Sequence, residues 1–237
     1  MTTATSTAAP TVLLHGGGRA PSPQLWRAFA LPRVAVVVLE DDEPEAAFAR
    51  WDGVLAAAGA GARIAVPVSA GRPLEPGHLA GCDGVVIAHG LTPGYAAAVT
   101  PQATALREVL STLVVGGSSA GAAVLAEHAL VGGWRLSGRA VCAEEAGEDL
   151  DEVRVVPGLG LLPGACVDVH AAQWGTVSRL VATVAAGLAP AGVALDEETV
   201  LTHGLGVWQV RGAGHAWELA GPDAPLRVLR DGDALAR

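Results

Sequence analysis

One serine of the chain stands in a context that suits nucleophilic catalysis. Residues 116–121 read Gly-Gly-Ser-Ser-Ala-Gly, which places Ser119 after an apolar, β-prone run and before an alanine-rich, helix-like run to His128. This is the strand-turn-helix setting of a Gly-x-Ser-x-Gly nucleophile elbow, in which glycines let strand and helix approach closely. The backbone N–H of Ala120 is then expected to stabilise an oxyanion. The same pattern also arises in ordinary βα turns, so Ser119 needs partners.

Two further residues have the types and places that such a serine requires. A hydroxyl becomes a good nucleophile when a base takes its proton, and that base needs an acid to orient it. His170 and Glu197 each follow an apolar, strand-like segment. All three side chains are therefore expected at the same edge of a parallel sheet. The alternative, that His170 is a hydrogen-bonded core histidine and Glu197 begins a turn, stays open.

The composition argues against several other kinds of function. The chain of 237 residues has a net charge of −9 and contains no lysine, which argues against nucleic-acid binding and excludes Schiff-base chemistry. Its three cysteines, Cys82, Cys142 and Cys166, are widely spaced and predict neither a disulfide framework nor a zinc site. The acidic run at residues 40–43 is interpreted as a solvated turn, and the Gly triplet at 16–18 lacks dinucleotide-binding spacing. We therefore expect no metal and no cofactor.

The order of apolar segments predicts an α/β protein. No apolar run approaches the roughly 20 residues of a membrane helix, so no membrane partner is expected. Residues 1–10 are polar and small, and we interpret them as a flexible tail instead of a signal peptide, which favours a cytoplasmic location. Residues 11–237 are expected to form a single domain.

Strands alternate with helical stretches in the first half of the chain. This alternation predicts a doubly wound, mostly parallel sheet flanked by helices, with additional short antiparallel strands in the C-terminal part. The expected strands are 11–14, 34–39, 63–68, 84–88, 113–115, 136–143, 153–156, 165–169 and 192–195, followed by a meander over 200–219. The expected helices are 44–55, 100–110 and 176–186, with a short helix or loop at 74–82.

Four motifs, in register, resemble the cyanophycinase-like branch of the S51 serine peptidases, which have a class I glutamine amidotransferase-like fold. They are Gly-Gly-Ser-Ser-Ala-Gly-Ala at 116–122, Pro-Gly-Leu-Gly-Leu-Leu-Pro-Gly at 157–164, Asp-Val-His at 168–170 and Ala-Leu-Asp-Glu-Glu-Thr at 194–199. The resemblance covers roughly residues 11–210. It implies that Ser119 is the nucleophile, His170 the base and Glu197 the acid that orients it. It also implies that Gly90 supplies a second oxyanion N–H beside that of Ala120.

The chain departs from that family around the substrate. The family pattern has a glutamine before the catalytic histidine, then several arginines that hold a β-aspartyl carboxylate and an arginine-bearing dipeptide. Here Val169 replaces the glutamine, Trp174 and Thr176 stand at arginine positions, and Thr92 replaces a loop glutamine. At about 1.5 to 3 kcal/mol per charge-assisted hydrogen bond, these losses predict a substrate other than cyanophycin. The residues expected around the substrate are His89, Thr92, Asp168, Val169, Trp174 and Arg179, with Trp174 and Tyr95 making the pocket more apolar.

These observations together predict a serine hydrolase that cleaves a peptide, isopeptide or related amide through an acyl-enzyme. Two alternatives stay open: an acyl transferase that uses the same triad, and a non-catalytic binding module on the same scaffold. The expected partner is a small peptide or amide, and the resemblance implies a homodimer. The natural substrate and the endo or exo mode of cleavage do not follow from the sequence.

Overall fold

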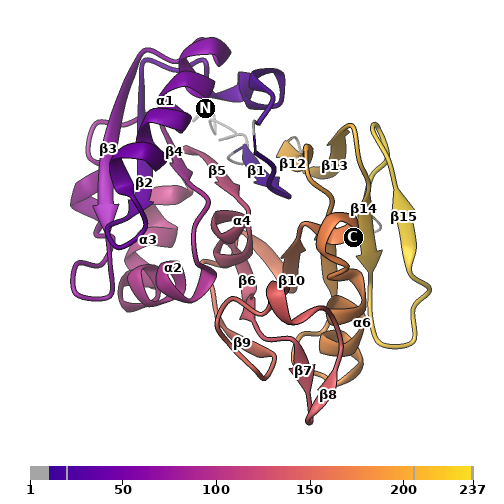
Figure 1. Cartoon of the computed structure of the whole chain (residues 1–237). Helices are drawn as coiled ribbons and strands as arrows, with labels where there is room; N and C mark the ends of the chain where they lie inside the picture. The colour runs from indigo at the N-terminus through magenta and orange to yellow at the C-terminus, as the bar shows by residue number, and fades with distance from the viewer. Residues whose placement is uncertain (1–10, 20, 205, 236–237) are drawn as a thin grey trace, which may run out of the picture.

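Two mixed β-sheets lie side by side in the molecule (Figure 1). The computed structural model describes residues 11–19, 21–204 and 206–235, so the predicted tail at residues 1–10 lies outside the described residues. The first sheet has the strand order β13-β12-β1-β5-β4-β2-β3 and the second has the order β15-β14-β11-β10-β6-β9. Parallel strands form the centre of both sheets, which confirms the predicted α/β class.

The first sheet carries the N-terminal half of the chain. β1 to β5 run parallel, and the hairpin of β12 and β13 joins β1 in an antiparallel sense. Its strands are β1 (Val12–His15), β2 (Arg33–Leu39), β3 (Ala62–Val68), β4 (Gly84–Ile87), β5 (Val114–Ser118), β12 (Thr199–Gly204) and β13 (Val207–Gly212).

Helices cover both faces of this sheet because alternate strand residues point to opposite sides. On one face Val36 packs with Trp26 of the 3₁₀ helix η1 (Pro23–Phe29) and Trp51 of α1 (Pro44–Ala58). On the other, Val37 packs with Tyr95 and Leu106. These belong to α2 (Thr92–Val99) and α3 (Ala103–Leu110), which the 3₁₀ turn η3 (Thr100–Gln102) connects; a further turn, η2, spans Pro76–Leu79.

The second sheet is built from the C-terminal half. β6, β10 and β11 are parallel, whereas β9, β14 and β15 pair in an antiparallel sense. Its strands are β6 (Ala126–Gly132), β9 (Arg154–Pro157), β10 (Leu162–Val169), β11 (Gly192–Leu195), β14 (Ala216–Leu219) and β15 (Arg227–Leu229). The remaining elements are β7 (Arg135–Leu136), β8 (Arg139–Ala140), the 3₁₀ turn η4 (Glu144–Ala146), the one-turn helix α5 (Ala171–Trp174) and α6 (Val177–Ala185).

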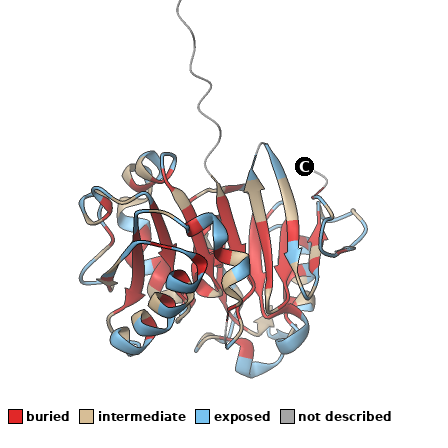
Figure 2. Cartoon of the chain, turned by 90° about the horizontal axis from the view of Figure 1, so that it is seen from above, coloured by how far each residue is buried: buried red, intermediate tan, exposed pale blue. Residues whose placement is uncertain are grey.

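The two sheets are joined by α4 (Ala120–Leu125), whose six residues are all buried. It packs against α2, β5, β6 and β10. One buried hydrophobic cluster contains residues of both sheets, and Figure 2 shows buried strands in the middle of the molecule with exposed residues on the outer helices and loops. None of the described helices is long and apolar enough to cross a membrane.

The structure differs from the sequence prediction in four places. The strand expected at 136–143 is instead two short strands, β7 and β8, which pair with each other, and residues 141–143 lie outside them. The helix-like run to His128 ends at Leu125, because from Ala126 the chain pairs with β9 and β10, and this pairing overrides the alanine helix propensity. The segment 92–99, not expected to be helical, forms α2 with a proline in its first turn, where that residue suits a helix. The predicted C-terminal meander is divided, since β12 and β13 join the first sheet and β14 joins the second.

Candidate active site

Ser119 occupies the sharp turn between β5 and α4. Its backbone angles are φ 53° and ψ −117°, a conformation that residues other than glycine adopt at a cost in energy. The Ser119 N–H donates to the carbonyl of His15 on β1 at 2.9 Å. A β-carbon on Gly117 would lie 2.4 Å from the Gly121 backbone, so strand and helix are in close contact. The local geometry is that of a nucleophile elbow.

Ser119, His170 and Glu197 form a continuous hydrogen-bonded row. The Ser119 Oγ lies 2.8 Å from His170 Nε2, and His170 Nδ1 lies 2.8 Å from Glu197 Oε1. The carboxylate accepts, so Nδ1 carries the proton and Nε2 is left to accept the serine proton. The three residues follow the carboxyl ends of β5, β10 and β11. The expectation of one shared sheet edge was wrong, because β5 belongs to the first sheet and β10 and β11 belong to the second.

Neighbouring backbone holds the histidine and the glutamate in place. The His170 N–H donates to Gly16 O, and the Glu197 N–H donates to the side-chain oxygen of Gln173, both at 3.0 Å. A β-carbon on Gly17 would lie 2.3 Å from His170 Cε1, so the glycine loop after β1 packs directly on the imidazole. The Gly triplet therefore supports the histidine, a role that its sequence alone does not indicate.

Burial controls the protonation of His170. Desolvation lowers its pKa below the ordinary value of 6.5, although Glu197 acts in the opposite direction through its hydrogen bond and its charge. Trp174 stacks on the ring, with centroids 3.9 Å apart and planes inclined by 10°. His170 is therefore neutral at pH 7 and able to accept a proton.

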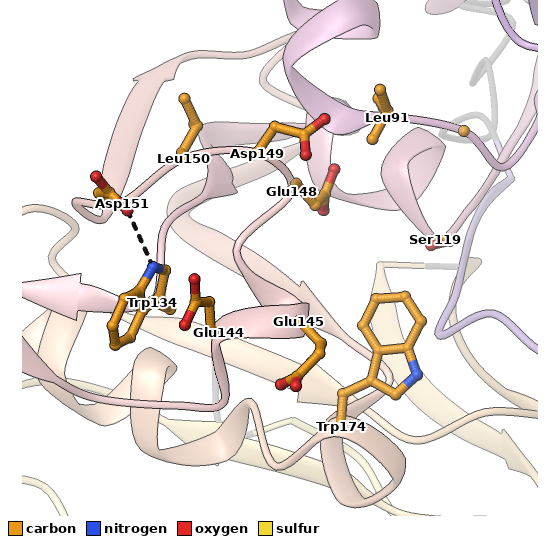
Figure 3. A pocket seen from close by; sticks show the side chains of 11 residues that line it. Leu91, Ser119, Trp134, Glu144, Glu145, Glu148, Asp149, Leu150, Asp151 and Trp174 are labelled. Carbon is orange, nitrogen blue, oxygen red and sulfur yellow. Dashed lines mark hydrogen bonds between the residues drawn. The ribbon is translucent and has the colours of Figure 1, made fainter.

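A cavity of about 430 Å³, here called the acidic cavity, opens beside Ser119. Gly90, Trp134 and Trp174 line part of it. Figure 3 shows Ser119 and Trp174 at one end and Trp134 and Asp151 at the other. Five carboxylate side chains from one loop complete the lining: Glu144, Glu145, Glu148, Asp149 and Asp151. These carboxylates make the pocket strongly anionic, whereas the sequence predicted a more apolar pocket lined by Trp174 and Tyr95. Tyr95 does not line it, because its side chain is buried in the core.

A second cavity of about 590 Å³, here called the arginine cavity, has the opposite character. It is lined by Arg19, Arg50 and His89 together with Ser119, His170 and Glu197. Gly90 and Trp174 line both cavities. The nucleophile therefore lies between a space bordered by carboxylates and a space bordered by two guanidinium groups.

Several residues that the sequence placed near the substrate have other partners. Arg179 and Asp168 are buried and form a bidentate ion pair with distances of 2.8 and 2.6 Å. Val169 is buried beside them in β10. The Thr92 hydroxyl donates to Glu148 at 2.8 Å. Of the six residues expected around the substrate, the cavities beside Ser119 are lined by His89 and Trp174.

Sequence reasoning missed the charged residues around the serine. Arg19 and Arg50 come from the β1 loop and from α1, and the five carboxylates come from a loop whose composition looks like that of a solvated turn. The only signal was the density of acids in residues 144–152, Glu-Glu-Ala-Gly-Glu-Asp-Leu-Asp-Glu. Among the described residues, no group of three or more His, Cys, Asp or Glu side chains is arranged to hold a metal ion.

Gly90 and Ala120, the residues expected to supply the oxyanion donors, both lie near Ser119. Gly90 borders both cavities together with Ser119, and no acceptor for its N–H is found within the described residues. Ala120 is the first residue of α4, and first-turn N–H groups have no acceptor within a helix. Both N–H groups are thus free to bind a ligand oxygen.

Comparisons with known proteins agree with this architecture. The chain is 35% identical over 103 residues to cyanophycinases of Trichormus variabilis and of a Nostoc species. That match covers 43% of this chain and about a third (32%) of the length of those relatives. No protein-family model matches the chain.

Two solved structures share the fold. A peptidase from an acI-B1 actinobacterium superposes with a TM-score of 0.68 at 18% identity, covering 96% of this chain and 97% of that one. A putative peptidase E protein from Listeria monocytogenes gives a TM-score of 0.56 at 11% identity, covering 87% and 100%. The resemblance to cyanophycinases and the fold predicted from the sequence are both confirmed.

Proposed function

We propose that the protein is a serine hydrolase that cleaves an amide, peptide or isopeptide bond through an acyl-enzyme on Ser119. The observation that carries this proposal is the row of two 2.8 Å contacts from Ser119 through His170 to Glu197, built on a strained elbow. A histidine that only stabilised the core would not need to join a strained, cavity-lining serine to a carboxylate. The similarity to cyanophycinases supports the same chemistry.

The reaction follows from these groups. Nε2 of His170 takes the Ser119 proton while Oγ attacks the carbonyl carbon, and Glu197 stabilises the imidazolium. The N–H groups of Gly90 and Ala120 bind the oxyanion of the tetrahedral intermediate. His170 then gives its proton to the leaving amine as the C–N bond breaks. A water molecule, deprotonated by His170, attacks the acyl-serine and releases the acid.

The opposite charges of the two cavities support a substrate that carries charges of both signs. A cationic group fits the acidic cavity, and a carboxylate fits beside Arg19 and Arg50. A dipolar substrate with the scissile bond between the two charges satisfies both. In the sequence, Val169, Trp174 and Thr92 differ from the cyanophycinase pattern and argued against cyanophycin as substrate. Arg19 and Arg50, which lie outside the four motifs, nevertheless supply cationic groups beside Ser119. The β-aspartyl-arginine dipeptide is thus a suitable test compound.

A panel of isosteric dipeptides tests both parts of the proposal. Hydrolysis of β-aspartyl-arginine is compared with that of β-aspartyl-citrulline, which lacks the guanidinium cation. It is also compared with that of the same arginine dipeptide carrying a primary amide in place of the aspartyl α-carboxylate. We expect each neutral analogue to lose about 10- to 100-fold in kcat/KM, or about 1.4 to 2.7 kcal/mol. The loss should shrink at high salt, because the cavities are open to solvent.

The Ser119→Ala variant is the control for chemistry. It should hydrolyse none of the three compounds. Equal kcat/KM for arginine and citrulline compounds would contradict the dipolar substrate but leave the serine mechanism standing. Hydrolysis that persists in Ser119→Ala would contradict the mechanism itself.

A further inference from the structure

The short loop between β4 and α2 carries Gly90 past the nucleophile. Gly90 has φ 155°, and a β-carbon there would lie 3.1 Å from Asp42 Oδ2 and from Leu39 Cδ1. The loop is held on its N-terminal side, where the Ala88 N–H donates to Val37 O at 3.0 Å. Gly90 lies between this hydrogen bond and the start of α2, and its N–H has no acceptor among the described residues. Its direction therefore depends on how the other end of the loop is held.

Glu148 holds that other end. One carboxylate oxygen accepts the Thr92 N–H at 2.5 Å, and the other accepts the Thr92 hydroxyl at 2.8 Å. Thr92 is the first residue of α2 and lies two positions after Gly90. Glu148 comes from the acidic loop, 56 residues away in sequence. This bidentate contact joins the loop that borders the acidic cavity to the loop that carries Gly90.

Glu148 differs from its acidic neighbours in this respect. Glu144 and Glu145 are exposed, and they line the cavity without a bond to the Gly90 loop. Burial raises the pKa of Glu148, and the two Thr92 bonds and Arg179 act against that rise. Burial therefore disfavours the ionised carboxylate of Glu148, and its two hydrogen bonds from Thr92 offset part of that cost. The Glu148 carboxylate is therefore better placed to hold Thr92 than to attract a solvated cation.

We propose that Glu148 is a positioning residue for the reaction on Ser119, which aims the Gly90 N–H at the developing oxyanion by holding Thr92. This inference rests on the proposed serine-hydrolase function. It assigns to Glu148 an effect on the rate of the chemical step, separate from any attraction of the acidic cavity for a cation.

Four variants separate the positioning role from charge and from folding. Glu148→Ala removes both acceptors. Glu148→Gln removes the charge, but its oxygen can accept the Thr92 N–H while its amide donates to the hydroxyl oxygen. Thr92→Val keeps the shape and the N–H but loses the hydroxyl. Glu108→Ala is the matched control, because it makes the same change of charge at an exposed side chain of α3 that lines neither cavity beside Ser119.

The readout is the reaction of Ser119 with a fluorophosphonate, whose phosphonyl oxygen needs the oxyanion donors but not the peptide-binding residues. The inactivation rate constant and the apparent binding constant are measured separately, and thermal unfolding is followed on the same samples. For Glu148→Ala we expect the inactivation rate constant to fall about 10- to 100-fold, because one oxyanion donor is partly lost. The apparent binding constant for the fluorophosphonate should change little. The rate constant of Thr92→Val should fall less, that of Glu148→Gln should recover to within a few-fold, and Glu108→Ala should react normally.

Other results would overturn the inference. If Glu148→Ala and Thr92→Val react like the unmodified chain, or differ only in melting temperature, Glu148 has a structural role alone. If Glu148→Gln is as slow as Glu148→Ala, charge and not position is responsible. If the unmodified chain itself fails to react at Ser119, the hydrolase proposal fails and the positioning role fails with it.

Discussion

His170 is the residue on which protonation acts most directly. Its ring packs against Gly17 of the β1 loop and stacks on Trp174, and its two nitrogens contact Ser119 and Glu197. Burial favours the neutral ring, whereas Glu197 favours the charged ring. Because burial is the larger influence, the resting base is the neutral imidazole that the mechanism requires.

The pH dependence of the reaction follows from the lowered pKa of His170. The neutral form predominates above that pKa, so kcat/KM should rise with a midpoint below pH 6.5 and stay level at neutral pH. Glu197→Gln removes the carboxylate that does most to raise the pKa of His170, so the midpoint should move further down while the plateau falls by up to about 10⁴-fold. Initial rates between pH 4 and 8 test this. A midpoint above 6.5 in the unmodified chain would show that burial does not dominate.

The elbow at Ser119 depends on close contact between the backbone of α4 and that of the neighbouring strands. A β-carbon on Gly121 would lie 2.1 Å from the carbonyl oxygen of Ile87 on β4. The spacing of the glycines around Ser119 predicted the close contact of β5 with α4, but not this contact of α4 with β4. The sequence could not predict that α4 ends after six residues, because that depends on the pairing of β6 in the second sheet.

Gly121→Ala should therefore disturb both stability and reactivity. We expect a loss of about 1 to 3 kcal/mol in the free energy of unfolding, from the strain of an overpacked contact, and slower labelling of Ser119 by a fluorophosphonate. Gly53→Ala is the matched control, since Gly53 lies in α1 with nothing within 4 Å of the added β-carbon. That change should stabilise the helix by about 0.5 to 1 kcal/mol. Urea unfolding of both variants provides the comparison, and similar losses in the two would argue against a tight elbow.

At the scale of the whole molecule, the charged surroundings of the serine are assembled from segments distant in sequence. The candidate triad could be predicted because Ser119 and His170 directly follow apolar strands and Glu197 lies two residues after one. The sequence could not show that these strands belong to two sheets. The arginine cavity could not be predicted, because neither Arg19 nor Arg50 belongs to a recognisable sequence motif. The fold brings the β1 loop and α1 to the same cavity. Asp168 and Arg179 show the reverse: their spacing looked functional, but the pair is buried and Arg179 also donates to the carbonyls of Gly133 and Ala146.

His15, at the end of β1, links the fold to pH. It is buried and contacts Ser118 Oγ through Nδ1 at 2.9 Å, and burial together with the charge of His170 lowers its pKa to about 3. Between pH 3 and 6.5 the unfolded chain therefore binds more protons at this residue than the folded chain does. Stability is complete above the unfolded pKa and decreases as the pH falls from about 6.5 towards 3.

Urea unfolding at pH 5 and pH 7 measures this effect. At this site the free energy of unfolding should fall by up to about 1.4 kcal/mol per pH unit within the window. His15→Asn, whose amide can still bond to Ser118, should lose much of that dependence whatever its stability at pH 7. An unchanged dependence in His15→Asn would show that other groups cause the acid sensitivity.

The central claim is that Ser119 forms a covalent acyl-type adduct because His170 and Glu197 activate it. Its most direct test is intact-mass measurement and peptide mapping of the chain after reaction with a fluorophosphonate. We predict one adduct per chain, located on Ser119, absent in Ser119→Ala and formed far more slowly in His170→Ala. An adduct on another residue, or equal rates in the unmodified chain and His170→Ala, would contradict the account.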